Sequence, residues 1–398
     1  METIQLTIAD ETLRDGEQQV GVCFNKETKR KLAHGIASTG VHSIALMPAV
    51  HPVEEQLVKV LVADGLVAQL AASTLMSKSA ILQSKDAGVQ HIILFHAVSD
   101  RLLMLRDPEI QLSEGQPELR DLALSSGVKP TPAQIQLVRT NMCRRVRQHL
   151  EYATQLGLRI SFAAEDASRA DFDFLVECIN TFSPYLEQFL LCDTVGCLTP
   201  EKSYIWIHDL LASARCAPLI VHFHNDMGLA LENTIQAVRA GAAGISGTFG
   251  GIGERAGNVA IEQVLNGLRL RFGWEVAGID YEAIARVSQS LDQLGARAYP
   301  PYSQAAQRHE AGIHVHSLIR DRLSYAIFPH GQPEIWFGKH SGVSNIRYLF
   351  EHCLQKQLDR EKYEKICLDI KNLSIQQNRS FSTAEILQWL QNQSYDSA

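Results

Sequence analysis

Apolar residues in this chain gather in short runs that alternate with segments of helical periodicity. The runs are Ile4 to Ala9, His42 to Met47, Val67 to Ser73, His91 to His96, Arg159 to Ala164, Gln188 to Cys192, Leu219 to His224 and Gly244 to Thr248. Between two of them, apolar residues recur at three-and-four spacing at Ile135, Val138, Met142, Val146 and Leu150. The runs are typical of buried strands and the spacing of amphipathic helices. Eight such units in about 270 residues predict a TIM (β/α)8 barrel.

A doubly wound open sheet is the alternative fold for this alternation. It usually has a glycine-rich phosphate-binding turn after the first strand, and this chain has none there. We therefore favour the closed barrel.

The alternation stops after Phe272, which predicts a second region. An amphipathic segment from Ile279 to Leu294 leads to the rigid sequence Tyr299-Pro300-Pro301-Tyr302. We expect a catalytic barrel over residues 1–275 and mainly helical C-terminal subdomains over 276–398.

The C-terminal region should contain three further helices, around Ser341 to Leu354, from Arg360 to Leu373, and after Ser382. Glu385 lies three residues after Ser382 and completes a capping box. Only about 25 residues follow Leu373, which is too few for a full regulatory domain.

One predicted connection is long. Some 30 residues, from Ser99 to Pro130, follow the fourth apolar run and include apolar patches at Leu102 to Leu105 and Leu119 to Leu124. Loops of that length are uncommon and often act as lids. A substrate lid and a plain insertion both remain open.

Composition narrows the class of protein. The chain has 398 residues, is 45% hydrophobic and 20% charged, and carries a net charge of −7. This balance argues against nucleic-acid binding, which requires a basic face. We expect a cytoplasmic protein, because the N-terminus lacks a signal pattern and no apolar stretch approaches the roughly 18 residues of a membrane span. The eight cysteines have no CxxC spacing and are expected to be reduced thiols.

Polar residues follow the predicted strands where a barrel has its working face. His222 and His224 are one pleat apart, so their imidazoles should point the same way and could hold a divalent metal. Hydrogen-bonded interior histidines are the alternative. Other strand ends carry Arg14-Asp15, Glu165-Asp166, Asp193-Thr194 and the glycine-rich stretch from Gly250 to Asn258. So many polar strand ends together indicate a site rather than separate structural roles.

Four of these stretches carry a family resemblance. They are Asp10 to Gln18 (DETLRDGEQ), His222 to Asp226 (HFHND), Gly251 to Asn258 (GIGERAGN) and His309 to His314 (HEAGIH), and the match continues through Gly338 to Gly342. They resemble the homocitrate synthase, 2-isopropylmalate synthase and citramalate synthase family, relatives of hydroxymethylglutaryl-CoA lyase. Four motifs in order are far more specific than one.

The resemblance implies a metal-dependent acyltransferase that condenses acetyl-CoA with a 2-oxo acid, giving a 2-substituted malate and free CoA. The implied ligands of a divalent metal (zinc, manganese or magnesium) are Asp15, His222, His224 and Asn258. The implied catalytic residues are Arg14, which would steady charge on the carbonyl oxygen, Glu165, His314 and Tyr325. The implied substrate-binding residues are Arg14, Thr194, His96, Ala163 and Ser161. His314 and Tyr325 are expected to come from the partner subunit of a homodimer.

Departures from the family pattern bear on the substrate. Gly247 to Asn258 contains no cysteine, unlike the lyase branch, and Ser161 stands where some homocitrate synthases have an arginine for 2-oxoglutarate. Ala45 and Ala163-Ala164 replace larger or charged residues. An apolar site makes burial of a second carboxylate costly. We therefore lean towards an apolar or aromatic 2-oxo acid, such as phenylpyruvate, which would give benzylmalate.

Other activities remain open. The first is a homocitrate synthase that uses 2-oxoglutarate, and the second is a lyase resembling hydroxymethylglutaryl-CoA lyase or 4-hydroxy-2-oxovalerate aldolase. A barrel that binds metal without catalysis is disfavoured, because Arg14, Glu165 and His314 are all present.

Overall fold

A computed structural model describes residues 1–67, 69–108, 130–326 and 332–393. Eight parallel strands close into a barrel in chain order, and the first pairs with the last. They are β2 (Thr7–Asp10), β3 (Ser43–Leu46), β4 (Leu70–Thr74), β5 (His91–Ala97), β6 (Arg159–Glu165), β7 (Gln188–Asp193), β8 (Leu219–Phe223) and β9 (Gly244–Gly247). The predicted TIM barrel is confirmed.

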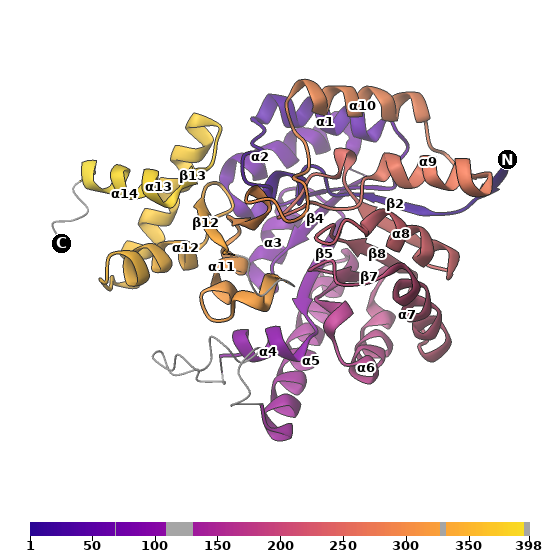
Figure 1. Ribbon diagram of the computed structural model, residues 1–398, viewed down its shortest axis with the longest axis horizontal. Helices are drawn as coiled ribbons and strands as arrows, with labels where there is room; N and C mark the ends of the chain where they lie inside the picture. The colour runs from indigo at the N-terminus through magenta and orange to yellow at the C-terminus, as the bar shows by residue number, and fades with distance from the viewer. Residues whose placement is uncertain (68, 109–129, 327–331, 394–398) are drawn as a thin grey trace.

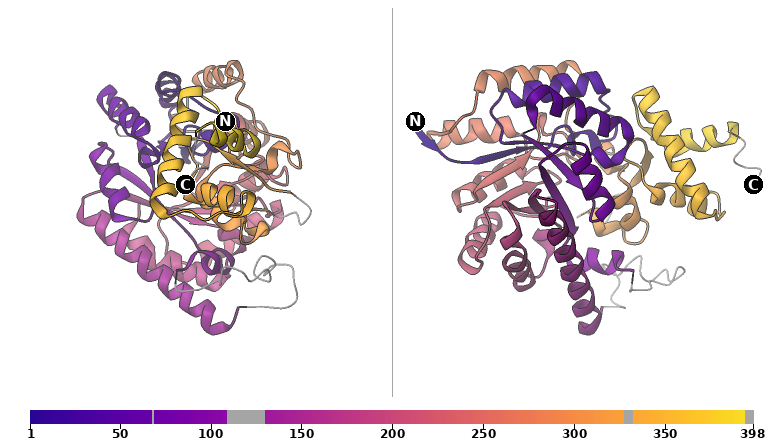
Figure 2. Two further views of the ribbon diagram at one scale, coloured as in Figure 1. Left: turned by 90° about the vertical axis from the view of Figure 1, so that its left-hand side faces the viewer. Right: turned by 180° about the vertical axis from the view of Figure 1, so that it is seen from behind.

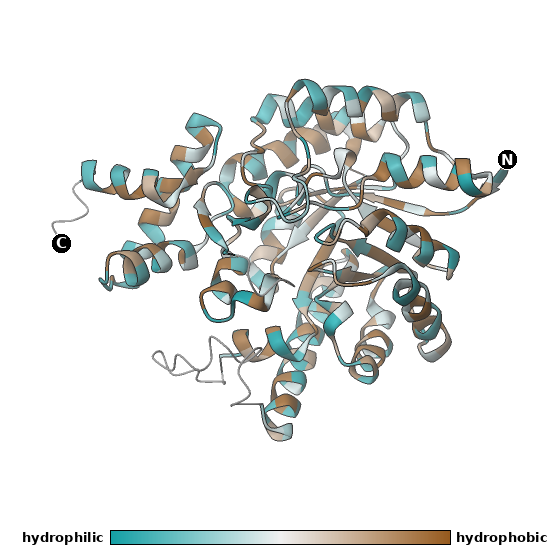
Figure 3. Cartoon of the chain, viewed as in Figure 1, coloured by the Kyte–Doolittle hydropathy of each residue, from teal (hydrophilic) through white to brown (hydrophobic). Residues whose placement is uncertain are grey.

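Helices surround the barrel (Figure 1). They are α1 (Lys26–Ala37), α2 (Pro52–Leu61), α3 (Lys78–Asp86), α5 (Pro132–Gln155), α6 (Phe172–Phe182), α7 (Pro200–Ser213), α8 (Ala230–Arg239) and α9 (Ile261–Phe272). Figure 3 shows brown, apolar strands inside and teal, hydrophilic turns on the outer helix faces. Such two-sided helices bury one face against the strands and leave the other in solvent.

The predicted strand from Ile4 to Ala9 is wrong in its extent. The chain forms two strands there, and the first, β1 (Glu2–Ile4), lies outside the barrel and pairs in parallel with β10 (Trp274–Val276). Directly after α9 the chain returns beside β1, and the backbone of β10 pairs with the backbone of β1 there. Apolar periodicity does not contain this information, because it reports burial and not the partner of a strand.

The expected long loop also contains a helix. Ser99 caps α4 (Asp100–Arg106) by accepting a hydrogen bond from the Leu102 N–H at 3.4 Å, and Leu102 to Leu105 are buried. Residues 109–129, including the second apolar patch, lie outside the described residues, so the lid stays a prediction.

The chain after the barrel ring is largely helical. α10 (Tyr281–Gln293) lies beside α1 (Figure 1). Beyond it come α11 (Gly312–Leu318), α12 (Val343–Arg347), α13 (Arg360–Gln377) and α14 (Thr383–Asn392), together with a small sheet of β11 (Arg308–His309), β12 (Glu334–Phe337) and β13 (Phe381–Ser382). The predicted capping box at Ser382 and Glu385 is present at the start of α14.

The part of the chain after residue 300, called here the C-terminal segment, lies at the opposite end of the molecule from the N-terminus (Figure 2). The predicted division at residue 275 stays a prediction. None of the described helices is both long and apolar enough to cross a membrane.

Candidate active site

A cavity of about 310 Å³ lies where the barrel strands end and the C-terminal segment covers them. Both parts of the chain contribute polar side chains to its wall. They include Arg14, Asp15, Glu165, Thr194, His222, His224, Glu254 and His314. The position agrees with the working face of TIM-barrel enzymes.

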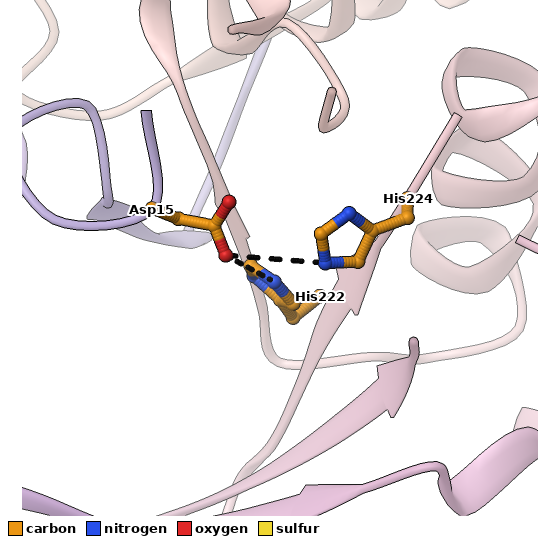
Figure 4. A group of neighbouring side chains, drawn as sticks. All are labelled: Asp15, His222 and His224. Carbon is orange, nitrogen blue, oxygen red and sulfur yellow. Dashed lines mark ion pairs between the residues drawn. The ribbon is translucent and has the colours of Figure 1, made fainter. Parts of the chain in front are cut away.

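Asp15, His222 and His224 converge in this cavity (Figure 4). The Asp15 Oδ2 lies 3.6 Å from His222 Nε2 and 3.9 Å from His224 Nε2, and all three side chains are buried. Ligand bonds of about 2.1 Å to a shared ion give spacings of this order. The structure thus brings together residues that are more than 200 positions apart in the chain.

The charge states of these groups fit a divalent cation. Burial alone would raise the pKa of Asp15, but Arg14 and the two imidazoles outweigh it and hold the pKa well below its usual range. Burial and the nearby Arg255 hold the pKa of His224 well below its ordinary value. His222 Nδ1 lies 3.1 Å from the Ser246 hydroxyl, which fixes the ring so that Nε2 faces Asp15. An ionised carboxylate at Asp15 and a neutral imidazole at His224 are the states that a bound metal requires.

Asn258 is the fourth expected ligand, and two hydrogen bonds donated by its side-chain amide nitrogen fix its orientation. Its Nδ2 donates to Asp15 Oδ1 at 2.8 Å and to the Ile252 carbonyl at 3.2 Å. Its buried Oδ1 has no hydrogen-bond partner among the described residues. An orphaned buried oxygen beside Asp15 suits a cation, because it can satisfy its lone pairs there. This donor set fits zinc, manganese or magnesium.

Arg14 places a fixed positive charge beside these residues. Its Nε donates to Glu11 Oε2 at 2.7 Å and its Nη1 to Asp15 Oδ2 at 3.1 Å. Burial works against the charge, but Glu11 and Asp15 raise the pKa of Arg14 above its usual value. The guanidinium can therefore stabilise negative charge that develops on a ligand in the cavity.

Arg106 on α4 is a site residue that the sequence did not predict. It binds both carboxylate oxygens of Glu165, at 2.5 Å through Nη1 and 2.9 Å through Nη2. The Tyr325 hydroxyl also donates to Glu165 and accepts from Arg106. Burial raises the pKa of Glu165, but Arg106 and Tyr325 outweigh it and lower the pKa to about 2. Glu165 is thus held as an anion.

His314 on α11 completes the polar wall. Its Nε2 lies 2.9 Å from Glu254 Oε2, and its ring stacks on Tyr325 with 3.6 Å between ring centroids. The Glu254 N–H donates to Asp15 Oδ1 at 3.2 Å, which ties this dyad to the candidate ligands. His314 and Tyr325 belong here to the same chain as the barrel. The expected homodimer, with these residues completing the partner's site, stays a prediction.

The remaining expected substrate contacts divide into two groups. Thr194 and Ala163 line the cavity, and the Thr194 Oγ1 accepts from the Asp166 N–H at 2.8 Å, which leaves its own proton to donate. Ser161 lies deeper in β6, where its hydroxyl is 2.8 Å from His91 Nε2. His96 is not brought to the cavity, because the strand pleat turns its neighbour Phe95 inward instead.

Much of the wall near the barrel centre is apolar. The cavity is lined there by Met47, Ile93, Phe95, Leu190 and Ala163, which lie on or just after β3, β5, β6 and β7. Such a wall favours the binding of an apolar ligand group, because the apolar surface of the ligand is removed from water.

The chain is similar to known proteins over most of its length. Residues 5–108 and 129–291 match the model of the HMGL-like family. The homocitrate synthase AksA of Methanothermobacter thermautotrophicus is 32% identical over 87% of this chain and 84% of its own. A probable 2-isopropylmalate synthase of Ignicoccus hospitalis is 32% identical over 87% and 82%, respectively. Homocitrate synthase 1 of Nostoc sp. is 30% identical over 99% of both chains.

A solved structure supports the fold. The HMG-CoA lyase from Brucella melitensis superposes with a TM-score of 0.56 and 18% identity, covering 74% of this chain and 99% of the lyase.

Proposed function

Since the chain belongs to the HMGL-like family, we propose that it condenses acetyl-CoA with a 2-oxo acid and releases a 2-substituted malate and free CoA. One observation carries the proposal. Three of the candidate metal ligands (Asp15, His222 and His224), the Arg14 guanidinium and the His314–Glu254 dyad line the same cavity. A metal-binding barrel without catalysis would have no need of the last two.

A divalent cation held by Asp15, His222, His224 and Asn258 would polarise the carbonyl of the 2-oxo acid. The chain's own residues position and charge the reactants. Thr194, with its hydroxyl proton free, donates to the C1 carboxylate. Arg14 stabilises the negative charge that forms on the C2 oxygen during attack.

His314 is the group placed to take the proton from the acetyl methyl. Glu254 accepts from its Nε2, and its Nδ1 has no hydrogen-bond partner in the described part of the chain. This tautomer leaves the Nδ1 lone pair as the base. The methyl carbon then bonds to the C2 carbon, and the C2 oxygen takes up a proton. Water attacks the thioester, which leaves a carboxylate and the CoA thiol.

Glu165 acts here as a fixed anion and is a poor base, because Arg106 and Tyr325 occupy both of its oxygens and lower its pKa to about 2. It accepts a hydrogen bond from the Tyr325 hydroxyl and so positions the ring that stacks on His314. Arg106 and Glu165 are thus positioning residues for the acid/base pair.

The apolar wall supports an uncharged side chain on the 2-oxo acid, with phenylpyruvate as our first choice. Ala163 and Phe95 border space that a ring can fill, and Ser161 offers no cation to a second carboxylate. 2-Oxoglutarate is the alternative substrate. Cleavage of hydroxymethylglutaryl-CoA is disfavoured, since residues 247–258 contain no cysteine.

Thiol release from acetyl-CoA, measured with a panel of 2-oxo acids, tests this function. We expect release that requires both substrates, with kcat/KM highest for phenylpyruvate or a branched 2-oxo acid. A preference for 2-oxoglutarate overturns the substrate but not the reaction. Cleavage of 4-hydroxy-2-oxovalerate without CoA overturns the reaction.

His314→Gln should lower kcat by about 10²-fold or more if the imidazole is the base. His208→Gln is the matched control, because His208 is exposed on α7, where it contacts only its neighbours Asp209 and Tyr204 among the described residues. Unchanged turnover in His314→Gln removes this residue from the mechanism.

A further inference from the structure

The cavity has a cationic corner that the proposed chemistry does not use. Lys371 on α13 and His340, in the turn after β12, both line it next to Val50 of the loop after β3. Arg14 and Lys371 are the only arginine or lysine residues among the described lining residues. The proposed reaction assigns Arg14 to the C2 oxygen of the 2-oxo acid, so Lys371 is the lining cation left for a second anionic group.

Lys371 has little to balance its charge. Among the described residues its ammonium donates to one group, the Val50 carbonyl, at 3.0 Å, and forms no ion pair. Burial lowers the pKa of Lys371, and the more distant charges of Cys367 and Glu310 offset this effect only in part. An ammonium has three N–H donors, and one carbonyl satisfies one of them. The remaining donors favour an anion in the cavity.

His340 adds a second group without a partner. It is 8% exposed, and neither ring nitrogen has a hydrogen-bond partner among the residues described. The nearest carboxylate oxygen, Glu17 Oε2, is 4.0 Å from Nε2 and already accepts from Lys29 and Lys339 at 2.7 Å each. A buried imidazole that makes no hydrogen bond is costly, and a ligand oxygen in the cavity would satisfy it.

We propose that Lys371 and His340 form a subsite for an oxyanion that a substrate carries into the cavity. This rests on the proposed function, which supplies two sources of such a group. One is a phosphate of acetyl-CoA, and the other is the distal carboxylate of a dicarboxylic 2-oxo acid. The second source would provide the handle that Ser161 does not provide, from the C-terminal segment rather than from the barrel.

Equilibrium binding of coenzyme A, 2-oxoglutarate and phenylpyruvate to the full-length protein tests the subsite. Lys371→Gln removes the charge and keeps a donor for the Val50 carbonyl. We expect this variant to bind coenzyme A or 2-oxoglutarate about tenfold more weakly or worse, as for a lost charge-assisted hydrogen bond. Its affinity for phenylpyruvate should stay within about twofold of wild type. A loss of affinity for coenzyme A identifies the phosphate as the group bound by the subsite. A loss of affinity for 2-oxoglutarate alone identifies the distal carboxylate.

Two further variants separate charge from folding. Lys371→Arg keeps a cation and should bind within about threefold of wild type. Lys365→Met is the matched control, because Lys365 is an exposed lysine on the same helix. The subsite is overturned if Lys371→Gln binds both coenzyme A and 2-oxoglutarate with Kd values within about twofold of wild type. It is also overturned if Lys371→Arg loses as much affinity as Lys371→Gln. Binding is measured without turnover, so failure of the proposed condensation does not affect this result.

Discussion

Asp15 is the most constrained side chain of the candidate site. Its Oδ1 accepts from the Asn258 amide and from the Glu254 N–H, while its Oδ2 faces Arg14 and both imidazoles. These contacts therefore fix the orientation of the Asp15 carboxylate before any ligand binds. Such support of a ligand by its neighbours is worth about 10 to 100-fold in metal affinity.

Gly253→Ala should disturb this support. A Cβ at Gly253 would lie 2.1 Å from Asn258 Nδ2 and 2.8 Å from Asp15 Oδ1, at a φ of +155°. We expect the affinity for Mn²⁺ or Zn²⁺, measured by calorimetry, to fall at least about tenfold. Gly273→Ala is the control, since its φ is +69° but its Cβ would meet no atom within 4 Å. Equal cation affinity in both variants contradicts the assignment.

Arg106→Met should change the pH dependence of the enzyme. In the wild type the pKa of Glu165 is about 2, so this carboxylate stays ionised through any working pH. Without Arg106, burial dominates and raises the pKa above the ordinary value of a glutamate. We expect the acid limb of kcat/KM against pH to move upward, because protonation of Glu165 then enters the working pH range.

Arg101→Met is the control for this profile. Arg101 lies on the same helix and donates to the Leu323 carbonyl at 3.1 Å, without contact to Glu165. Its acid limb should keep the wild-type position even if the rate falls. An unmoved limb in Arg106→Met means that Glu165 does not depend on Arg106 for its charge.

The sequence predicted side chains at strand ends better than side chains elsewhere. Asp15, His222, His224 and Thr194 lie at the ends of strands or in the loops that follow them, where the barrel geometry fixes their direction. Arg106 could not be found in this way, because it belongs to no motif and lies on a helix within an expected loop. Ser99 before an apolar run was the available sign of that helix. His96 shows the converse, since a shift of one position along a strand reverses the face.

At the level of elements, a buried charge cluster joins the C-terminal segment to the barrel. Lys29 of α1 donates to Glu17 at 2.7 Å and to Glu54 of α2 at 2.5 Å. Lys339, which follows β12, reaches the same two carboxylates at 2.7 Å each. All four side chains are buried, so two positive and two negative charges balance away from water.

Glu54→Ala should destabilise the fold by about 3–5 kcal/mol, because it leaves two buried ammonium groups facing one carboxylate. Urea unfolding measures the change. Glu55→Ala is the matched control on the same helix, since its pair with Lys59 is partly exposed and should cost about 1 kcal/mol or less. Equal losses in the two variants would show that the cluster has no special weight.

The same cluster has a pH signature. Burial opposes the charge of Glu54, but Lys29 and Lys339 lower its pKa below the usual range. The contribution of Glu54 to the free energy of unfolding is therefore complete when the pH is above the pKa of an unfolded glutamate, about 4.3. It is lost as the pH falls below that value.

The elements themselves were mostly readable from the sequence. Eight apolar runs correspond to the barrel strands, and Thr131 and Ser382 begin helices with capping boxes. The pairing of β1 with β10 could not be read, because it depends on where the chain returns after α9.

On the scale of the whole molecule, a bound cation should stabilise the fold, because its candidate ligands come from the loop after β2 and from the end of β8. Adding Zn²⁺ or Mn²⁺ at about 100 times Kd should add about 2.7 kcal/mol and raise Tm. Asp15→Asn should abolish the increase, whereas Glu55→Ala should retain it. A Tm that does not respond to either cation contradicts the site.

The order of the chain has a consequence for its synthesis. Asp15, His222 and His224 leave the ribosome before His314 and Tyr325, which are part of the C-terminal segment. A nascent barrel can thus acquire the candidate cation ligands while the proposed acid/base pair is still being translated. On the proposed function, thioester chemistry requires the C-terminal segment, about the last quarter of the polypeptide, over the strand ends, so we expect an interrupted translation product to be catalytically silent.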